Sequence, residues 1–200
     1  MDDEEQQLRS NLISQAVDAW ATADFLRRKV KWSTAWMRFM ATSSVLVPLL
    51  IGLIALNYPD LLAQQTWVRS VATGFLIAHT AISAVILMYS SPDRTRDAQD
   101  SEARNRNIAL RSDRLRRDEA MPSDSWKVLA RSLTSEYEHL EENDENRFHA
   151  TQQARRRSLR VGLRQFDARC RECKQTPIRE SLPWRWWRFD KYCNRCGERK

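Results

Sequence analysis

Two long apolar stretches, Phe39–Tyr58 and Val68–Tyr89, interrupt an otherwise polar chain. Each has about 20 residues, the length that crosses a ~30 Å hydrocarbon core as one helix. The first stretch contains no charged residue, and the second contains only Arg69 at its edge and His79 inside. Nine residues, Pro59–Trp67, separate the two stretches. The pattern therefore predicts two transmembrane helices joined as a tight hairpin.

Apolar residues recur at helical spacing on both sides of these stretches. The first stripe comprises Leu12, Ala16, Trp20, Ala23, Leu26 and Val30, and the second comprises Trp126, Leu129, Leu133, Tyr137 and Leu140. Each stripe needs an apolar partner, so we expect the two to pack together in one helical layer. Residues 97–119 are polar almost all round, and we expect them to lie in water or to pack loosely.

The distribution of basic residues predicts the orientation of the spans. The loop Pro59–Trp67 has no Lys or Arg and carries only Asp60, whereas basic residues flank the outer ends of both spans: Arg27, Arg28, Lys29, Lys31 and Arg38 before, Arg94 and Arg96 after. The positive-inside rule places such flanks, and hence both termini, in the cytoplasm. Trp and Tyr are enriched at membrane interfaces, so we expect interfacial positions for four residues: Trp32, Trp36, Trp67 and Tyr89.

The formal net charge of +7 is concentrated at the C-terminal end. Residues 147–200 contain 16 Lys and Arg and five Asp and Glu, a net charge of +11. Such a tail is suited to the anionic inner leaflet of a membrane or to nucleic acid. A solvated tail without a specific partner is an equally good interpretation.

The four cysteines form two CxxC pairs, Cys170 with Cys173 and Cys193 with Cys196, and 19 residues (174–192) lie between the pairs. This pattern is typical of a four-thiolate zinc site. Two disulfides are the alternative, which a reducing cytoplasm disfavours. Four thiolates leave no open coordination position, so we expect a structural Zn²⁺ in a zinc-ribbon-like module, with Gly197 in a left-handed turn. We expect the aromatic segment 183–189 to pack within this module or to face the lipid interface. Stacking of its rings on nucleic-acid bases is the less favoured interpretation.

His79 lies near the middle of the second stretch, where an ionisable residue is costly and is a functional candidate. The alternative is a neutral imidazole hydrogen-bonded to a neighbouring helix, with Ser43, Ser44 or Thr80 as the candidate partner. Small residues and one proline also lie inside the spans, and we interpret them, with His79, as pore or packing positions. They are Gly74, Ala78, Gly52, Ser44 and Pro48.

The chain shows none of the enzyme motifs that we sought: no GxSxG, no glycine-rich phosphate loop and no HExxH. We therefore expect a protein that is not an enzyme. The predicted fold is an all-α membrane protein in four parts. They are an amphipathic N-terminal helix (1–38), the two-span hairpin (39–58 and 68–89), a cytoplasmic helical region (90–146) and the basic tail with the zinc module (147–200).

This layout resembles the SLATT superfamily of bacterial two-transmembrane effector domains. The likeness covers about Leu12–Leu140, through the segment AWATADFLRRKVKW, the hairpin and the helix containing SEYEHL. Members found on mobile elements carry a C-terminal CxxC…CxxC module, typically with a gap shorter than 19 residues, and the four cysteines here match its positions. The resemblance implies antiviral defence at the bacterial inner membrane, where oligomerising hairpins permeabilise the membrane. Relatives often act downstream of nucleotide-signal synthases.

Two functions from different classes are therefore open. In the first, the chain is a membrane effector that forms homo-oligomers in the lipid bilayer and responds to a nucleotide signal or a protein partner. In the second, it is a membrane-anchored binding module that recruits a protein or, less favoured, nucleic acid. An anchor needs only one span, which favours the effector, whereas the charge of +11 on residues 147–200 favours the module.

Overall fold

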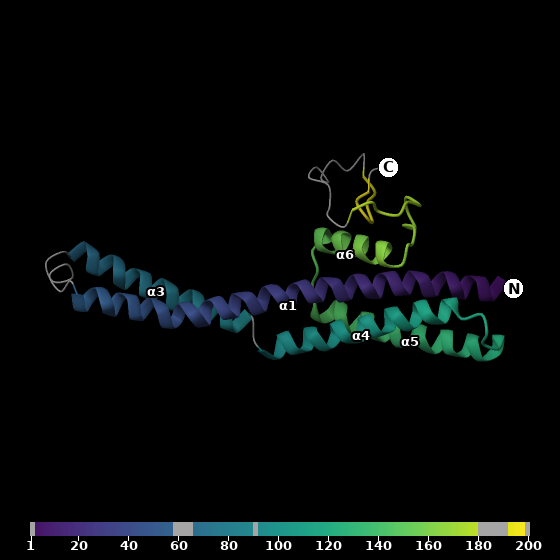
Figure 1. Ribbon diagram of the computed structural model, residues 1–200, viewed down its shortest axis with the longest axis horizontal. Coiled ribbons are helices and arrows are strands. Elements are labelled where there is room, and N and C mark those ends of the chain that lie inside the picture. Colours follow the sequence, from purple (N-terminus) through teal and green to yellow (C-terminus); the bar gives the residue numbers. More distant parts are fainter. Residues whose placement is uncertain (1–2, 58–65, 90–91, 180–191, 199–200) are drawn as a thin grey trace. The chain divides into compact units, whose positions relative to one another are not determined.

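The computed structural model describes residues 3–57, 66–89, 92–179 and 192–198, and within these ranges the fold is all-helical (Figure 1). The described residues contain five helices and no strand: α1 (Asp3–Asn57), α3 (Thr66–Tyr89), α4 (Pro92–Arg117), α5 (Ser123–Arg147) and α6 (Gln152–Gln165). The chain divides into two compact units. One combines Met1–Arg28 with Ala98–Lys200, and the other is Lys29–Asp97.

The core of the larger unit is formed by the two stripes expected from the sequence. Leu12 and Ala16 of α1 share one buried cluster with Trp126 and Leu133 of α5. The buried amide of Gln15 donates to the Leu133 carbonyl at 3.0 Å, which ties the two helices together beside this core. The predicted pairing of the N-terminal stripe with the 126–140 stripe is therefore confirmed. In the second stripe, Leu129 departs from this pattern because its side chain is exposed.

Helix α4 packs more tightly than its polar sequence predicts, and the expectation of loose packing is wrong. Its buried face consists largely of small and polar residues: Ala98, Ser101, Asn105, Ile108, Ala109, Ser112 and Leu115. Small side chains let helix backbones approach closely. The polar ones are compatible with burial where they find partners: Ser101 and Asn105 both donate to Asp144 of α5, at 2.5 and 2.6 Å.

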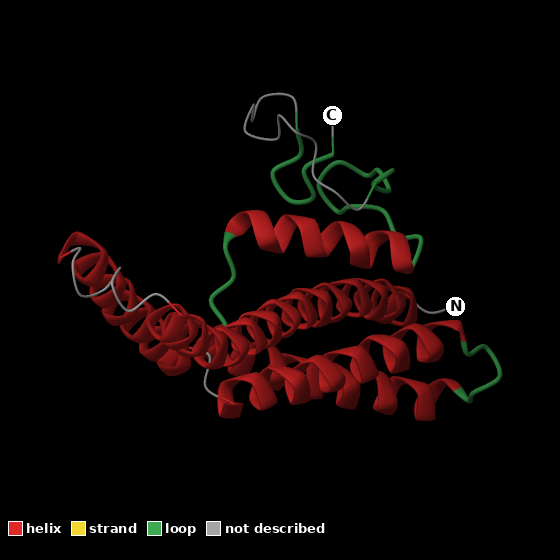
Figure 2. Cartoon of the chain, turned by 60° about the vertical axis from the view of Figure 1, so that its left-hand side comes forward, coloured by secondary structure: helices red, strands yellow, loops and turns green. Residues whose placement is uncertain are grey.

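Helix α6 lies on one side of α1, and α4 and α5 lie on the other (Figures 1 and 2). Gly162 marks the contact of α6 with α1, because a Cβ atom there would lie 2.4 Å from the carbonyl oxygen of Val17. Trp20 of α1 meets Phe166 edge-to-face, with ring centroids 5.7 Å apart. From the sequence this region is only part of the basic tail of residues 147–200, so this packed helix was not expected.

The unit Lys29–Asp97 contains the remainder of α1 and α3, which lie side by side and run in opposite directions (Figure 1). The two helices expose many large apolar side chains. Leu49, Leu53 and Val71 are each about 60% exposed. Apolar surface of this extent marks a membrane or a protein interface.

Among the described residues, α1 contains a segment that is long and apolar enough to cross a membrane, and none of that segment is buried. The apolar segment found in α3, Thr73–Val85, is shorter. By length and composition, α1 therefore gives weak support for membrane association. The second span and the hairpin across the bilayer stay predictions.

Candidate functional site: a four-cysteine centre and an adjoining cavity

The four cysteine sulfurs converge at one point of the larger unit. All four lie within 4.8 Å of one another, and none forms a disulfide. The Cys170 and Cys193 sulfurs are 3.8 Å apart, and those of Cys173 and Cys196 are 3.6 Å apart. A tetrahedron of thiolates about 2.3 Å from one ion has sulfurs about 3.8 Å apart. The donor set therefore fits a tetrahedral metal ion, and the four cysteines can bind a metal.

Each CxxC pair forms the same compact turn. The residue that follows the pair donates its backbone amide to the carbonyl of the first cysteine at 2.8 Å, Lys174 to Cys170 and Gly197 to Cys193. Both residues have positive φ, 59° at Lys174 and 70° at Gly197. The left-handed Gly197 was expected from the sequence. Lys174 adopts the same conformation without the freedom of glycine, which shows that the surrounding turn imposes it.

Burial and backbone amides act in opposite directions on these thiols. Burial raises the pKa of Cys196 and of Cys173. At Cys170 burial also opposes ionisation, but hydrogen bonds from the backbone at Cys173 and Glu172 outweigh it, and the pKa is lowered. The amides that favour the Cys170 thiolate are the groups that stabilise metal-bound sulfur.

Arg160 of α6 contacts and stabilises the second cysteine turn, which contains Cys193 and Cys196. Its side chain is almost fully buried and donates to the backbone carbonyls of Arg179 and Cys196, at 2.8 and 3.2 Å. It also forms a salt bridge of 2.8 Å with Glu198. A buried guanidinium is tolerated because these acceptors replace water. The basic tail of the sequence therefore includes a buried arginine that stabilises the interior, in addition to basic residues on the solvated surface.

The two cysteine turns also contact α1, each through an arginine. Arg171 Nε donates to the Ser14 hydroxyl at 2.8 Å, and Arg195 reaches the Asp18 carboxylate at 3.5 Å. Ser14 and Asp18 are one helical turn apart and so share a face of α1. The four-cysteine cluster is thereby positioned on the first part of α1.

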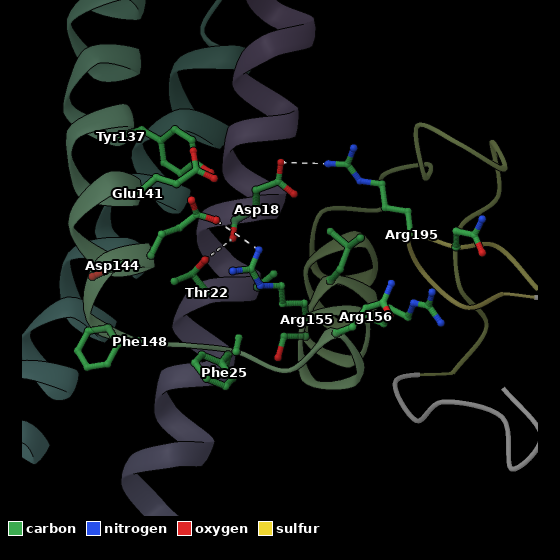
Figure 3. Close-up of a pocket in the computed structure, with 17 residues that line it drawn as sticks. Asp18, Thr22, Phe25, Tyr137, Glu141, Asp144, Phe148, Arg155, Arg156 and Arg195 are labelled. Atoms are coloured by element: carbon green, nitrogen blue, oxygen red, sulfur yellow. Dashed lines mark hydrogen bonds and ion pairs between the residues drawn. The ribbon is translucent and has the colours of Figure 1, made fainter. Parts of the chain in front are cut away.

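A cavity of about 370 Å³ opens beside this contact, between α1, α5, α6 and the second cysteine turn (Figure 3). Asp18 and Glu145 form ion pairs with arginines that also line it, Asp18 with Arg195 at 3.5 Å and Glu145 with Arg155 at 3.3 Å. The lining combines aromatic and charged side chains: Asp18, Thr22, Phe25, Tyr137, Glu141, Asp144, Glu145, Phe148, Arg155, Arg156 and Arg195.

The cavity contains three groups whose pKa values are shifted. Burial raises the pKa of Asp18, although Arg195 and Arg171 act against the shift. Burial likewise raises the pKa of Glu141, against the hydrogen bond from Tyr137. The pKa of Tyr137 is raised by burial and by the neighbouring carboxylates of Asp18 and Glu141. Shifted titratable groups that gather in a cavity are typical of a binding site.

His79, the ionisable residue of the second apolar stretch, meets the other helix of its unit. Its Nε2 lies 3.0 Å from the Ser43 hydroxyl, so the imidazole and a serine of α1 form a hydrogen bond between α1 and α3. Ser43 was one of the partners named for the interpretation of His79 as a neutral packing residue.

The small residues proposed for pore or packing lie on the outside of α1 and α3. Gly52, Gly74, Ala78, Ser44 and Pro48 are all exposed. No described atom outside the local helix backbone lies within 4 Å of a Cβ built on Gly52 or Gly74. These glycines therefore do not mediate a close approach of α1 and α3 in one chain. A role between copies stays a prediction.

The expected interfacial residues are described in part. Trp32 and Trp67 are exposed, at 69% and 66%, and Trp36 packs edge-to-face on Trp32 and on Phe39. The side chain of Tyr89 and the aromatic segment 183–189 lie outside what the structure describes.

Sequence reasoning identified the four cysteines that cluster and can bind a metal, but missed the residues that support them and the cavity. Arg156, Leu159, Arg160 and Leu163 recur at helical spacing, a signal that could have shown the buried face of α6. Nothing in the sequence marked Asp18 or Glu141, because the cavity joins segments that lie more than 100 residues apart.

The comparisons with known proteins agree with the cysteine pattern. No curated protein and no solved structure matches the chain. The sequence model of the family described as "Mobilome CxxCx(11)CxxC protein" matches residues 9–199. The gap between the cysteine pairs is 19 residues here, longer than the 11 of that description. Because the match covers nearly the whole chain, the protein belongs to the Mobilome CxxCx(11)CxxC family.

Proposed function

We propose that the protein is a membrane effector of a bacterial conflict system, in which the hairpin of the two spans 39–58 and 68–89 crosses the inner membrane twice and oligomerises to permeabilise it. The exposed apolar surface of α1 and α3 carries this proposal. Large side chains such as Leu46, Leu50 and Phe75 are more than half exposed, which is favourable in lipid and unfavourable in water.

The charge pattern supports an orientation with both termini in the cytoplasm. The loop between the spans lacks Lys and Arg, and basic residues flank the opposite ends of both spans. In that orientation the four cysteines lie in a reducing compartment, where a metal site is favoured over disulfides. We propose that the ion is a structural Zn²⁺, because four thiolates at tetrahedral spacing close its coordination sphere.

Small and polar residues on the exposed helix faces favour an oligomeric effector over a simple anchor. Gly52 and Gly74 leave open space on α1 and α3, and helices in membranes associate through such residues. The family description names the mobilome, which agrees with the mobile-element members of the SLATT superfamily that the sequence resembles. The effector therefore acts by assembly, without catalysis. A signal to the cytoplasmic part of the chain shifts this assembly, and high expression drives it by mass action in the absence of the signal.

Membrane depolarisation and dye entry after induced expression in bacteria test this proposal. We expect rapid permeabilisation by the intact chain, and none by a variant with Asp at two exposed positions, Leu50→Asp and Phe75→Asp. A matched variant with Leu46→Ile and Val71→Ile keeps the apolar surface and should behave like the wild type. If the membrane stays intact at high expression, with the protein present in the membrane fraction and its helices folded, the effector proposal fails.

The alternative is a membrane-anchored binding module that recruits a protein or nucleic acid. The net charge of +11 on residues 147–200 favours it. A version that ends at Asn146 separates the two functions. In a module, this truncation abolishes partner binding, and the membrane stays intact with or without the tail. In an effector, depolarisation of the membrane depends on the spans, which the truncated chain retains.

A further inference from the structure

The cavity beside the metal centre has the size and lining of a small-molecule site. Its volume of about 370 Å³ falls within the range of about 300–1,000 Å³ that ligand pockets occupy. Phe25 of α1, Tyr137 of α5 and Phe148 beyond the end of α5 give it aromatic walls. Figure 3 shows acidic side chains of α1 and α5 facing the arginines of α6 and the second cysteine turn.

Negative charge exceeds positive charge in this lining. Four carboxylates and three arginines line the cavity: Asp18, Glu141, Asp144 and Glu145 against Arg155, Arg156 and Arg195. Arg155 and Arg195 are already engaged across the cavity by Glu145 and Asp18. An anion would have to displace these carboxylates and would then face the others. The lining is therefore unsuited to a phosphate or a carboxylate ligand.

Two of the carboxylates are bonded by neutral donors. Asp144 is buried and accepts hydrogen bonds from Ser101 and Asn105. Glu141 accepts from the Tyr137 hydroxyl and, among the residues that the structure describes, forms no salt bridge. Its carboxylate therefore retains acceptor capacity on the rim of the cavity, next to Asp18 and the ring of Tyr137.

We propose that this cavity binds a small organic cation with N–H donors, an amine or a guanidinium compound, through Glu141 and Asp18. Carboxylates accept charge-assisted hydrogen bonds from N–H groups, and the neighbouring rings attract a cation to their faces. A quaternary ammonium has no N–H to donate and binds more weakly. Partial burial raises the pKa of both carboxyl groups because it disfavours their charged forms. A bound cation stabilises the charged forms and offsets this effect of burial.

Calorimetric titration of the full-length protein in detergent micelles tests the proposal, with spermidine and agmatine as probes and choline as the quaternary control. We expect saturable binding of spermidine or agmatine, with an affinity at least tenfold above that of choline. Glu141→Gln should weaken it at least tenfold. The matched variant Glu142→Gln removes the same charge one residue away, outside the lining, and should bind like the wild type.

The proposal is overturned if neither amine binds at millimolar concentration, if choline binds as well, or if both Gln variants bind alike. Circular dichroism checks that Glu141→Gln keeps the helicity of the wild type. We expect it to be folded, because Glu141 is exposed. Asp18→Asn is a second variant that should also weaken binding. The result is independent of membrane permeabilisation, because none of these residues lies in the apolar segments of α1 and α3.

Discussion

At the scale of single residues, Arg160 shows how a basic cluster becomes part of a core. Its neighbours along the sequence are mostly basic or polar, a pattern usually found on solvated surfaces. In the structure its guanidinium binds two backbone carbonyls and Glu198, and hardly any of the side chain is exposed. The residue links α6 to the turn that contains Cys193 and Cys196.

Replacing Arg160 by Ala should therefore cost stability and loosen metal binding. Removing one partner leaves the Glu198 carboxylate and the Cys196 carbonyl without their donor, a loss on the order of 3 kcal/mol. Denaturant unfolding, followed by helicity, measures the loss, and the rate of zinc transfer to a chelator should rise. Arg157→Ala, on the exposed side of the same helix, is the control. Equal stability of the two variants would contradict this role.

Asp18 gives a pH dependence with a defined sign. Its pKa in the folded chain is raised above the ordinary 3.8, so the folded state holds this proton more tightly than the unfolded state. The stability that this group contributes is full below pH 3.8 and is lost as the pH rises through the raised pKa. Asp18→Asn cannot titrate, so its stability should fall less than that of the wild type over this range. If the free energies of unfolding of the wild type and Asp18→Asn change in parallel from about pH 3 upward, this role of Asp18 is contradicted.

At the scale of elements, the contact between α6 and α1 depends on the absence of a side chain at Gly162. A Cβ there would meet the backbone oxygen of Val17, which cannot move without moving α1. Gly162→Ala should destabilise the larger unit by about 1–3 kcal/mol, although Ala is otherwise the better helix residue by about 1 kcal/mol. Differential scanning calorimetry measures this change.

Arg157→Ala is the control for this prediction, since Arg157 is an exposed residue of the same helix α6. It should leave the stability unchanged or raise it slightly. If both alanine variants behave alike, the close approach at Gly162 does not hold α6 on α1.

The pair α1 and α3 is joined by the Ser43–His79 hydrogen bond, whose two atoms are 3.0 Å apart. Ser43→Ala should weaken the association of the two helices by about 0.6 kcal/mol, and His79→Ala should add little once Ser43 is gone. Thr80→Ala is the control, because Thr80 donates to Leu76 of its own helix. Unfolding in mixed micelles measures the single variants, the double variant and the wild type, and additive losses would rule out a direct pair.

Periodicity predicted the elements whose apolar residues are large and missed the contacts made by small or charged ones. Leu12 and Trp126 predict the α1–α5 core, because large apolar residues at spacings of three and four are typical of one buried face of a helix. The buried face of α4 consists mostly of Ala, Ser and Asn, which hydropathy scores as neutral or polar. Its burial depends on Asp144, about 40 residues away, and no local pattern contains that information.

At the scale of the whole molecule, α1 is the element that both units share, because it runs from Asp3 to Asn57 without interruption. Its first part carries Ser14 and Asp18, which contact the two cysteine turns, and its later part is the apolar segment. The cysteine spacing predicted the four-cysteine cluster because two CxxC pairs are typical of a site that gathers four thiolates around one metal ion. The cavity could not be predicted, since it exists only where α1, α5 and α6 meet.

A single labelling experiment decides whether Lys29–Asp97 crosses the membrane twice with both termini inside. The variant Gln64→Cys places a thiol in the loop between the spans, while Cys193 reports on the C-terminal module. In intact cells, a membrane-impermeant maleimide should label the variant at its introduced thiol and leave the wild type unlabelled, and both proteins should react after lysis under chelation. Labelling of the wild type in intact cells, or no labelling of the Gln64→Cys variant, would contradict the two-span hairpin.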